Sequence, residues 1–337
     1  MELLLTYAER IKTARLCRMK MYINVIHKES GKPRALLFCD MVWCFLRYGI
    51  GYLEYRTFGF VWQDRAHRAT YMTMSDNHRI SRRLNDRAKR EIFEDKIAFL
   101  RRFAPLVKRD WLDLEASTPQ ERRAFAAVHP VCFAKTRAGF GGRGVERVEL
   151  CAGGEDDVFR RLLAEGKTLV EEPIQQHPRM AALCSRSVNT LRIATILKDG
   201  EVHVMYTLAR IGNGRGDVDN ITSGGMYAPV GADGRIAQSA FCDKTGQYYD
   251  RHPVSGVEIP GFEVPLYRES IALVQEAARV VPEVRYVGWD VALTASGPLL
   301  VEGNTLPGFY IRQNYRHLGE KKQGAKPDFI AVLGEEF

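Results

Sequence analysis

Hydrophobic positions recur at three- and four-residue spacing through much of the first 110 residues. Ile80, Leu84, Ala88 and Ile92 form one such series, and arginine and lysine side chains stand between them. This spacing places apolar side chains on one face of a helix and basic side chains on the other. The pattern predicts a mainly helical, basic N-terminal region over residues 1–110.

From about residue 113 the pattern changes to short apolar segments that alternate with helical stretches. Thr118, followed by a proline and by Glu121, predicts the start of a helix. Asp199-Gly200 predicts a hairpin turn between two strands. The predicted strands cover residues 131–135, 145–150, 168–172, 190–198, 201–211, 287–294 and 298–303, and further helices cover residues 156–165 and 267–281. Such a mixture is typical of an α+β fold.

The composition is that of an ordinary globular protein. The 337 residues are 45% hydrophobic, 27% charged and 10% aromatic, which argues against a disordered chain or a disulfide scaffold. Seven cysteines without metal-ligand spacing favour reduced thiols in a cytoplasmic protein. The longest apolar stretch, residues 35–46, is interrupted by Asp40 and is too short for a membrane span, and the N-terminus lacks the apolar core of a signal peptide.

Positive charge is concentrated in the first third of the chain. The sequence carries 49 Lys and Arg against 41 Asp and Glu, and residues 1–110 hold 23 of the basic and 12 of the acidic side chains. An acidic partner is therefore expected. A nucleic acid is disfavoured, because the basic helices lack an interleaved aromatic stacking platform. Peripheral contact with an anionic membrane stays open.

A glycine-rich segment follows the strand predicted at residues 131–135. Lys135 ends that strand, and four glycines follow it: Gly139, Gly141, Gly142 and Gly144. Glycines let backbone N–H groups approach phosphate oxygens, and a lysine can neutralise their charge. The spacing fits neither the Walker loop nor the dinucleotide fingerprint. The segment predicts either a phosphate-binding loop or a plain hairpin turn.

Carboxylate and amide side chains gather near the end of the chain. If residues 295–297 form a three-residue hairpin loop, Asp290 lies opposite Glu302. Asn304 shares the face of Glu302, because side chains alternate along a strand. Like charges repel across a strand pair, whereas a divalent cation prefers oxygen ligands. The spacing favours a Mg²⁺ or Mn²⁺ site over a solvated hairpin.

Two further segments carry weaker signals. Residues 169–172 predict a strand that runs into Pro173, an ending that leaves backbone groups free to bind the edge of a base. Arg192 and Arg210 fall in apolar strands, where an unpaired guanidinium is costly, so each should meet an anion. That anion is either a ligand or the partner in an internal salt bridge.

In this order the segments resemble an ATP-grasp enzyme, of the sugar-transfer-associated branch related to RimK-like and D-alanine–D-alanine ligases. The resemblance spans about residues 48–308. It is carried by Asp95-Lys96, Lys135 with its glycines, residues 170–178, residues 187–192, Asp219-Asn220 with Gly224-Gly225, and Trp289-Asp290 with Glu302-Gly303-Asn304. It implies an α+β ATP-grasp fold, in which two subdomains clasp ATP, preceded by the helical basic region.

The resemblance also implies a role for single residues. Lys96 and Lys135 would contact the ATP phosphates, and the loop of Gly139, Gly141, Gly142 and Gly144 would close over them. Glu171, Glu172 and Ile174 would form the adenine hinge, mostly through backbone groups. His177 stands where many relatives hold the ribose with an acidic residue, and it would either bind the ribose or cap a turn.

The remaining implied residues surround the reacting groups. Asp290, Glu302 and Asn304 would hold one or two Mg²⁺ ions. Arg192, Arg210 and Asn220 would lie near the γ-phosphate and the acceptor carboxylate. The implied domains are a small lid subdomain at residues 111–175, a large subdomain with the metal site at residues 176–320 and a polar tail at residues 321–337.

The function implied is that of an ATP- and Mg²⁺-dependent carboxylate–amine ligase that forms an amide through an acyl phosphate. Its partners would be an acidic acceptor and an amine donor, with a sugar acid, an amino acid or a precursor of a cell-surface polysaccharide as candidates. A kinase with the same ATP site and a non-catalytic ATP-binding interaction protein are the alternatives. The sequence does not indicate the acceptor or the oligomeric state.

Overall fold

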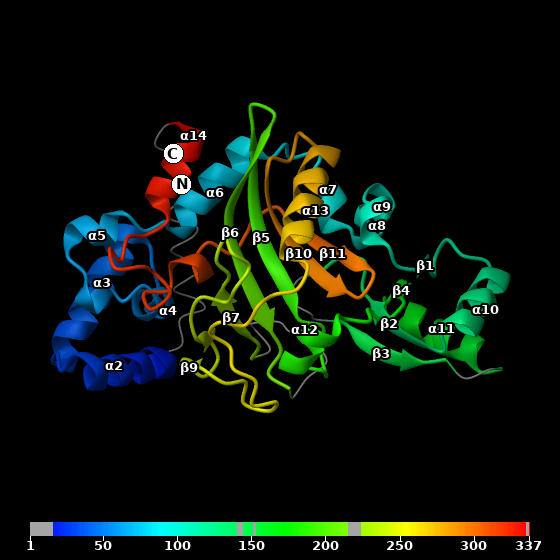
Figure 1. Cartoon of the computed structure of the whole chain (residues 1–337), viewed down its shortest axis with the longest axis horizontal. Helices are drawn as coiled ribbons and strands as arrows, with labels where there is room; N and C mark the ends of the chain where they lie inside the picture. The colour runs from blue at the N-terminus through cyan, green and yellow to red at the C-terminus, as the bar shows by residue number, and fades with distance from the viewer. Residues whose placement is uncertain (1–15, 140–143, 151–152, 215–223, 335–336) are drawn as a thin grey trace. The chain divides into compact units, whose positions relative to one another are not determined.

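The chain is described by a computed structural model that covers residues 16–139, 144–150, 153–214, 224–334 and 337. It divides into two compact units, of which the first joins Met1–Arg83 with Leu306–Phe337 and the second is Leu84–Thr305. Figure 1 labels most of their helices and strands. The division into four segments at residues 110, 175 and 320 stays a prediction.

The first unit is helical, as predicted for the N-terminal region, but a helix ends at Leu84, so the series Ile80, Leu84, Ala88 and Ile92 does not lie on one continuous helix. Its helices are α2 (Leu16–Ser30), α3 (Arg34–Tyr48), α4 (Tyr52–Thr57), α5 (Arg65–Ala69), α6 (Met74–Leu84), which ends at the boundary, and the 3₁₀ helices η1 (Phe60–Trp62) and η3 (Ile311–Gln313). Tyr55, Phe58, Phe60 and Tyr71 are buried and pack ring against ring at its centre.

The end of the chain is not a polar tail throughout. Residues 326–333 form helix α14 (Lys326–Leu333), which buries Phe329 and Leu333. The start of α14 is tied to the N-terminal helices, because the backbone N–H of Lys326 donates to the carbonyl oxygen of Thr70 at 2.9 Å. The side-chain oxygen of Gln313 accepts from the backbone N–H groups of both Met72 and Ala325. Because residues 321–337 include charged side chains, their composition alone does not indicate a helix with an apolar face.

The second unit contains two antiparallel sheets. The four-stranded sheet has the order β1-β4-β2-β3 and the seven-stranded sheet the order β11-β10-β5-β6-β7-β8-β9. The strands are β1 (Trp111–Asp113), β2 (Val131–Lys135), β3 (Glu146–Glu149), β4 (Leu169–Glu171), β5 (Thr190–Lys198), β6 (Glu201–Ile211), β7 (Met226–Pro229), β8 (Ala240–Cys242), β9 (Gln247–Tyr249), β10 (Tyr286–Thr294) and β11 (Gly297–Asn304). The helices are α7 (Glu91–Glu94), α8 (Lys96–Arg102), α9 (Ala104–Val107), α10 (Pro119–Val128), α11 (Glu155–Ala164), α12 (Pro178–Leu183) and α13 (Tyr267–Val280).

Helices α10 and α11 cover the four-stranded sheet. They contribute Phe125, Phe159 and Leu162 to a core that includes Cys132 and Val170 of the strands. Helix α10 begins as predicted: the Thr118 hydroxyl oxygen accepts from the Glu121 backbone N–H, and the Glu121 carboxylate accepts from the Thr118 backbone N–H. The two contacts satisfy donors that a helix start otherwise leaves free.

The seven-stranded sheet carries the larger core. Helix α13 packs against β5, β10 and β11 and buries Leu273, Val274 and Ala277. Phe93 and Phe103 from the α7–α9 segment contact the ring of Trp289 on β10. The indole N–H of Trp289 donates to the hydroxyl oxygen of Thr195 at 2.9 Å. This core fixes β10 and β11, the strands that carry the predicted metal ligands.

The hairpin between β5 and β6 turns where the sequence predicts. Asp199 and Gly200 have φ values of 50° and 82°, the two positive values that a tight two-residue hairpin turn requires.

Among the described helices of the chain, none is long and apolar enough to cross a membrane.

Candidate active site

Six of the predicted site residues line one pocket in the second unit. The pocket, about 480 Å³ when its solvent-open part is included, lies among α7, α8, β2, β4 and β11. The six residues are Lys96, Lys135, Gly139, Glu171, Glu302 and Asn304. Phe93, Phe99, Leu100, Val301 and Gly303 supply apolar wall. A concave site with an apolar wall and a few converging polar groups is the usual form of a ligand site.

Two lysines line the pocket. Lys96 begins α8, and its Nζ donates to the carbonyl oxygen of Gly139 at 2.8 Å. Burial lowers the pKa of Lys96, and the charge of Lys135 lowers it further. An anion placed between the two ammonium groups would relieve this repulsion.

The segment after β2 is held to the start of α8. Asp95 caps α8 by accepting from the backbone N–H groups of Ile97 and Ala98, and its second oxygen accepts from Arg137 Nε at 2.6 Å. The backbone N–H of Lys96 donates to the carbonyl oxygen of Arg137 at 3.0 Å. These contacts set the glycine-containing segment beside Lys96.

Glu171 is the buried anion of the pocket. Its carboxylate contacts Lys135 Nζ and accepts from Arg109 Nη2 at 2.7 Å. Burial alone would raise the pKa of Glu171, but the charges of Arg109 and Lys135 outweigh it and bring the pKa to about 2. Arg109 also donates from Nη1 to the carbonyl oxygen of Leu300 at 2.5 Å. One guanidinium thus joins β4 of the small sheet to β11 of the large sheet.

The role of Arg109 is not visible in the sequence. It lies 62 residues from Glu171 and 191 residues from Leu300. Both separations are far longer than those between residues that meet within one helix or across one hairpin. The only signal is its position just before the first strand of the small sheet.

The hinge residues differ in how their backbone is used. Glu171 lies in the ladder between β1 and β2, opposite Trp111 and Phe133, and the Glu172 backbone N–H donates to the carbonyl oxygen of Asp110. Ile174 follows in a segment without regular structure. The backbone of Glu171 and the N–H of Glu172 are thus engaged within the small sheet, whereas the residues after Glu172 follow the end of β4.

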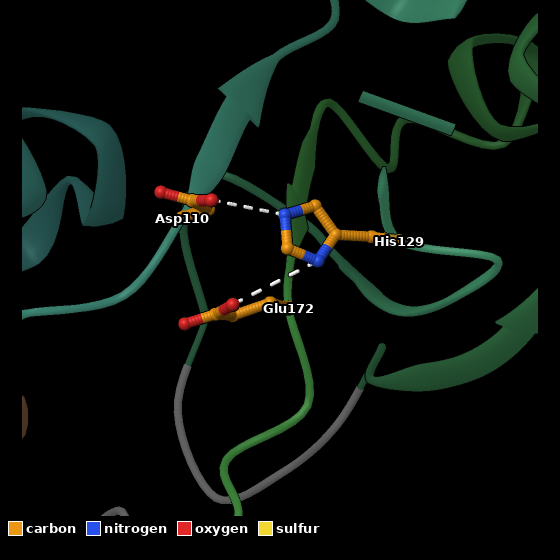
Figure 2. Close-up of side chains that lie close together, drawn as sticks. All are labelled: Asp110, His129 and Glu172. Carbon is orange, nitrogen blue, oxygen red and sulfur yellow. Dashed lines mark hydrogen bonds and ion pairs between the residues drawn. The ribbon is translucent and has the colours of Figure 1, made fainter. Parts of the chain in front are cut away.

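A histidine lies between Asp110 and Glu172, at the predicted hinge (Figure 2). His129, which ends α10, points its Nε2 at Asp110 Oδ2 at 3.0 Å and its Nδ1 at Glu172 Oε2 at 3.7 Å. The three side chains are close enough together to be considered as a metal site. However, the two carboxylates face different nitrogens of the His129 ring, and a single metal ion bonds to only one ring nitrogen. We therefore interpret the group as a link through Asp110, whose side chain is hydrogen-bonded to His129 and whose backbone carbonyl accepts from the Glu172 N–H.

The predicted pairing of Asp290 with Glu302 is confirmed, but the turn that produces it is different. Thr294 lies opposite Gly297, so the connection has two residues and not three. The register shifts between Asp290 and Val291, which leaves Val301 as an extra residue on β11. This β-bulge returns Glu302 to the position opposite Asp290.

Both arginines of the apolar strands meet Asp290. Arg192 Nε and Nη2 donate to its two carboxylate oxygens at 2.5 and 2.8 Å, and Arg210 Nη1 donates to Oδ2 at 2.6 Å. Despite burial, these two charges hold the pKa of Asp290 far below its usual range. The internal salt bridge left open by the sequence is the arrangement observed.

Glu302 has a different environment from Asp290. Burial and the neighbouring Asp290 charge raise the pKa of Glu302, and its Oε1 accepts from Asn304 Nδ2 at 3.3 Å. Glu302 and Asn304 line the pocket, whereas Asp290 lies with the arginines. A buried carboxylate beside a second carboxylate and an amide oxygen is a donor set that fits a hard divalent cation.

The remaining predicted residues are placed as follows. His177 is the N-cap of α12, where its Nδ1 accepts from the backbone N–H of Arg179 at 3.2 Å, so the capping role is observed. Gly144 has φ 77°, and a Cβ there would lie 3.2 Å from the Thr136 side chain. Gly141, Gly142 and Asn220 lie outside the described residues.

The family model for sugar-transfer associated ATP-grasp matches residues 150–321, just over half of the chain. The chain belongs to this family. The family match covers β4 to β11, including the strands of the Asp290–Glu302 pair and both arginines. The α+β architecture of the second unit and the helical first unit agree with the fold predicted from the motifs.

Solved ATP-grasp structures resemble the chain more distantly. The ATP-grasp ligase PsnB complexed with a minimal precursor is 15% identical with a TM-score of 0.41, and the match covers 74% of this chain and 63% of PsnB. D-alanyl-alanine synthetase A from Vibrio cholerae is 14% identical with a TM-score of 0.37, over 73% of this chain and 62% of the synthetase. The chain thus spans about three fifths of the length of these ligases. Comparison with the curated proteins gives no match.

Proposed function

We propose that the protein is an ATP- and Mg²⁺-dependent carboxylate–amine ligase. The observation that carries the proposal is the pocket that gathers Lys96 and Lys135 together with Glu302 and Asn304. The first pair suits phosphate oxygens, and the second suits a divalent cation bound to them. Membership of the ATP-grasp family supports the assignment of ATP as the nucleotide.

In this proposal the lysines, with Gly139, hold the phosphates of ATP. The ammonium group of Lys135 is held by its ion pair with Glu171, and the Glu171 carboxylate is held in turn by Arg109. The adenine lies against the hinge, where Glu171, Glu172 and Ile174 follow one another, and His177 supports the hinge by capping α12. Gly141, Gly142 and Gly144 complete the loop over the phosphates.

Glu302, Asn304 and Asp290 are the residues that would hold Mg²⁺, or Mn²⁺ in its place. Asp290 Oδ2 accepts from both arginines, whereas Oδ1 accepts from Arg192 Nε alone and so keeps one lone pair for a further ligand. The cation, when bound, would neutralise charge on the β- and γ-phosphates during transfer.

The reaction proposed is transfer of the γ-phosphoryl group to a carboxylate oxygen, which releases ADP and forms an acyl phosphate. An amine then attacks the acyl carbon, the amide bond forms, and inorganic phosphate leaves as the C–O bond breaks. Arg192, Arg210 and Asn220 orient the acceptor carboxylate and the γ-phosphate. No protein nucleophile is needed, because alignment and charge neutralisation supply the rate.

We propose a sugar acid, an amino acid or a precursor of a cell-surface polysaccharide as the acceptor, used in the cytoplasm. Charge complementarity supports an acidic acceptor, since the N-terminal third of the chain carries 23 basic and 12 acidic side chains. Five described cysteines are free thiols, as expected in a reducing compartment.

The test is release of ADP from ATP with pairs of carboxylates and amines, followed by mass spectrometry of the products. An amide together with phosphate supports the ligase, a stable phosphoester indicates a kinase, and no ADP release with any pair indicates a binding protein. The variant Glu302→Gln should lower turnover by about 10²- to 10³-fold. Turnover equal to that of the unmodified protein would refute the metal assignment, and the exposed variant Arg123→Gln is the matched control.

A further inference from the structure

Helix α3 in the first unit exposes an apolar face. Leu36, Phe38, Val42 and Leu46 keep 62%, 46%, 38% and 68% of their surface accessible. Cys39 lies between them and is exposed as well. Large apolar side chains gathered on one helix face are uncommon on a protein surface that contacts only water.

The opposite face of α3 is already packed. Leu37, Met41 and Cys44 are buried, and at 100° per residue they lie on the side of the helix facing away from Val42 and Leu46. A helix that is apolar on both sides is normally covered on both sides. The outer face of α3 therefore calls for a partner.

A basic residue lies at each end of α3. Arg34 begins the helix and Arg47 lies in its last turn, and both are exposed. The single acidic residue of α3, Asp40, accepts from Arg68 Nη1 and Nη2 at 2.7 Å each and from the Tyr55 hydroxyl at 2.5 Å. Its charge is thus neutralised within the unit. Residues 16–48 hold six Lys and Arg against two Asp and Glu.

We infer that the outer face of α3 docks on an anionic lipid bilayer. A helix of 15 residues is about 22 Å long, and it can lie in the plane of a membrane with Leu36, Phe38, Val42 and Leu46 among the acyl chains. Arg34 and Arg47 then meet the phosphate groups at its two ends.

A second copy of the chain fits this face less well. When two α3 helices pack antiparallel, Arg34 of each copy approaches Arg47 of the other, and when they pack parallel the same arginines meet. Either arrangement brings like charges together at both ends of the contact. Anionic headgroups complement the same charges, which favours lipid as the occupant. The inference does not rest on the proposed ligase activity.

The test is cosedimentation of the full-length protein with vesicles of phosphatidylcholine, with and without phosphatidylglycerol. We expect binding to the mixed vesicles, weak binding to phosphatidylcholine alone, and loss of binding as salt is raised. The double variant Leu36→Gln/Leu46→Gln should reduce the partition coefficient at least tenfold. Arg47→Gln should reduce it about fivefold.

The matched control is Val128→Gln, which alters a valine on α10 that is also 69% exposed. It should bind vesicles as the unmodified protein does. Circular dichroism and the thermal midpoint verify that each variant is folded. Equal binding to neutral vesicles, or equal binding of the double variant, overturns the inference. A dimer that sedimentation equilibrium detects for the unmodified protein but not for the double variant also overturns it, because the face would then join two copies.

Discussion

The guanidinium of Arg109 offers a direct test of what holds the two sheets of the second unit together. In Arg109→Leu, Glu171 stays buried and keeps only Lys135 as a charged partner, while the carbonyl oxygen of Leu300 loses its donor. Removing one partner of a buried ion pair typically costs about 3–5 kcal/mol. The pKa of Glu171 agrees in direction, because Arg109 and Lys135 together lower it to about 2 against the effect of burial.

Urea and thermal unfolding of the purified variant measure this loss. For a unit of this size we expect the thermal midpoint to fall by roughly 10 °C. The double variant Arg109→Leu/Glu171→Leu should recover part of the loss, because no uncompensated carboxylate is left buried. Arg123→Leu, which breaks the exposed ion pair with Asp156, should cost about 1 kcal/mol or less. A midpoint for Arg109→Leu within 2 °C of the control would refute the reasoning.

The same pair predicts how stability depends on pH. Because the pKa of Glu171 is lowered by folding, its contribution is complete above pH 4.5 and is lost as pH falls towards 2. The unmodified protein should therefore lose stability over this range more steeply than the double variant, which lacks the carboxylate. Parallel curves for the two proteins would show that Glu171 does not titrate as its surroundings indicate.

Two further substitutions test packing and local structure. Gly303→Ala places a Cβ 2.9 Å from the ring of Phe93, so we expect a loss of about 1–3 kcal/mol in the free energy of unfolding. The control Gly319→Ala, which has open space around it, should be nearly neutral. Equal losses for the two variants would contradict the packing. Thr118→Ala removes the acceptor at the start of α10 and should lower the free energy of unfolding by about 1 kcal/mol. The measurement is hydrogen exchange at the Glu121 amide, which should become faster. Unchanged exchange at this amide would argue against the cap.

Local patterns explain what the sequence predicts correctly. The capping pair of Thr118 and Glu121, the turn at Asp199-Gly200 and the helix beginning at Tyr267 each depend on residues a few positions apart. Such contacts follow from backbone geometry and are readable without a structure. The family motifs add Lys96, Lys135, Glu171, Glu302 and Asn304, which do meet in one pocket.

The pair formed by Asp290 and Glu302 shows the limit of such reasoning. A three-residue loop and a two-residue turn followed by a bulge at Val301 give the same opposition of these two residues. A sequence pattern of period two cannot distinguish them, because the bulge cancels the difference in turn length. The pairing is therefore predictable and the path of the backbone is not.

Contacts between distant segments escape prediction for a different reason. Arg109 binds Glu171 and Leu300, and His129 lies between Asp110 and Glu172. Each contact depends on how the sheets and helices pack, which no local spacing encodes. The outer face of α3 is similar, since a run of apolar residues does not reveal which side a core will bury.

The pairing of Asp290 with two arginines also sets the charge balance at the proposed metal site. Arg192 and Arg210 carry two positive charges, and Asp290 and Glu302, when both are ionised, carry two negative ones, so these four groups sum to zero. A divalent cation arriving alone would leave the group with a surplus of two positive charges. The phosphates of a nucleotide would remove that surplus. Metal and nucleotide should therefore bind as one complex, and each should raise the affinity of the protein for the other.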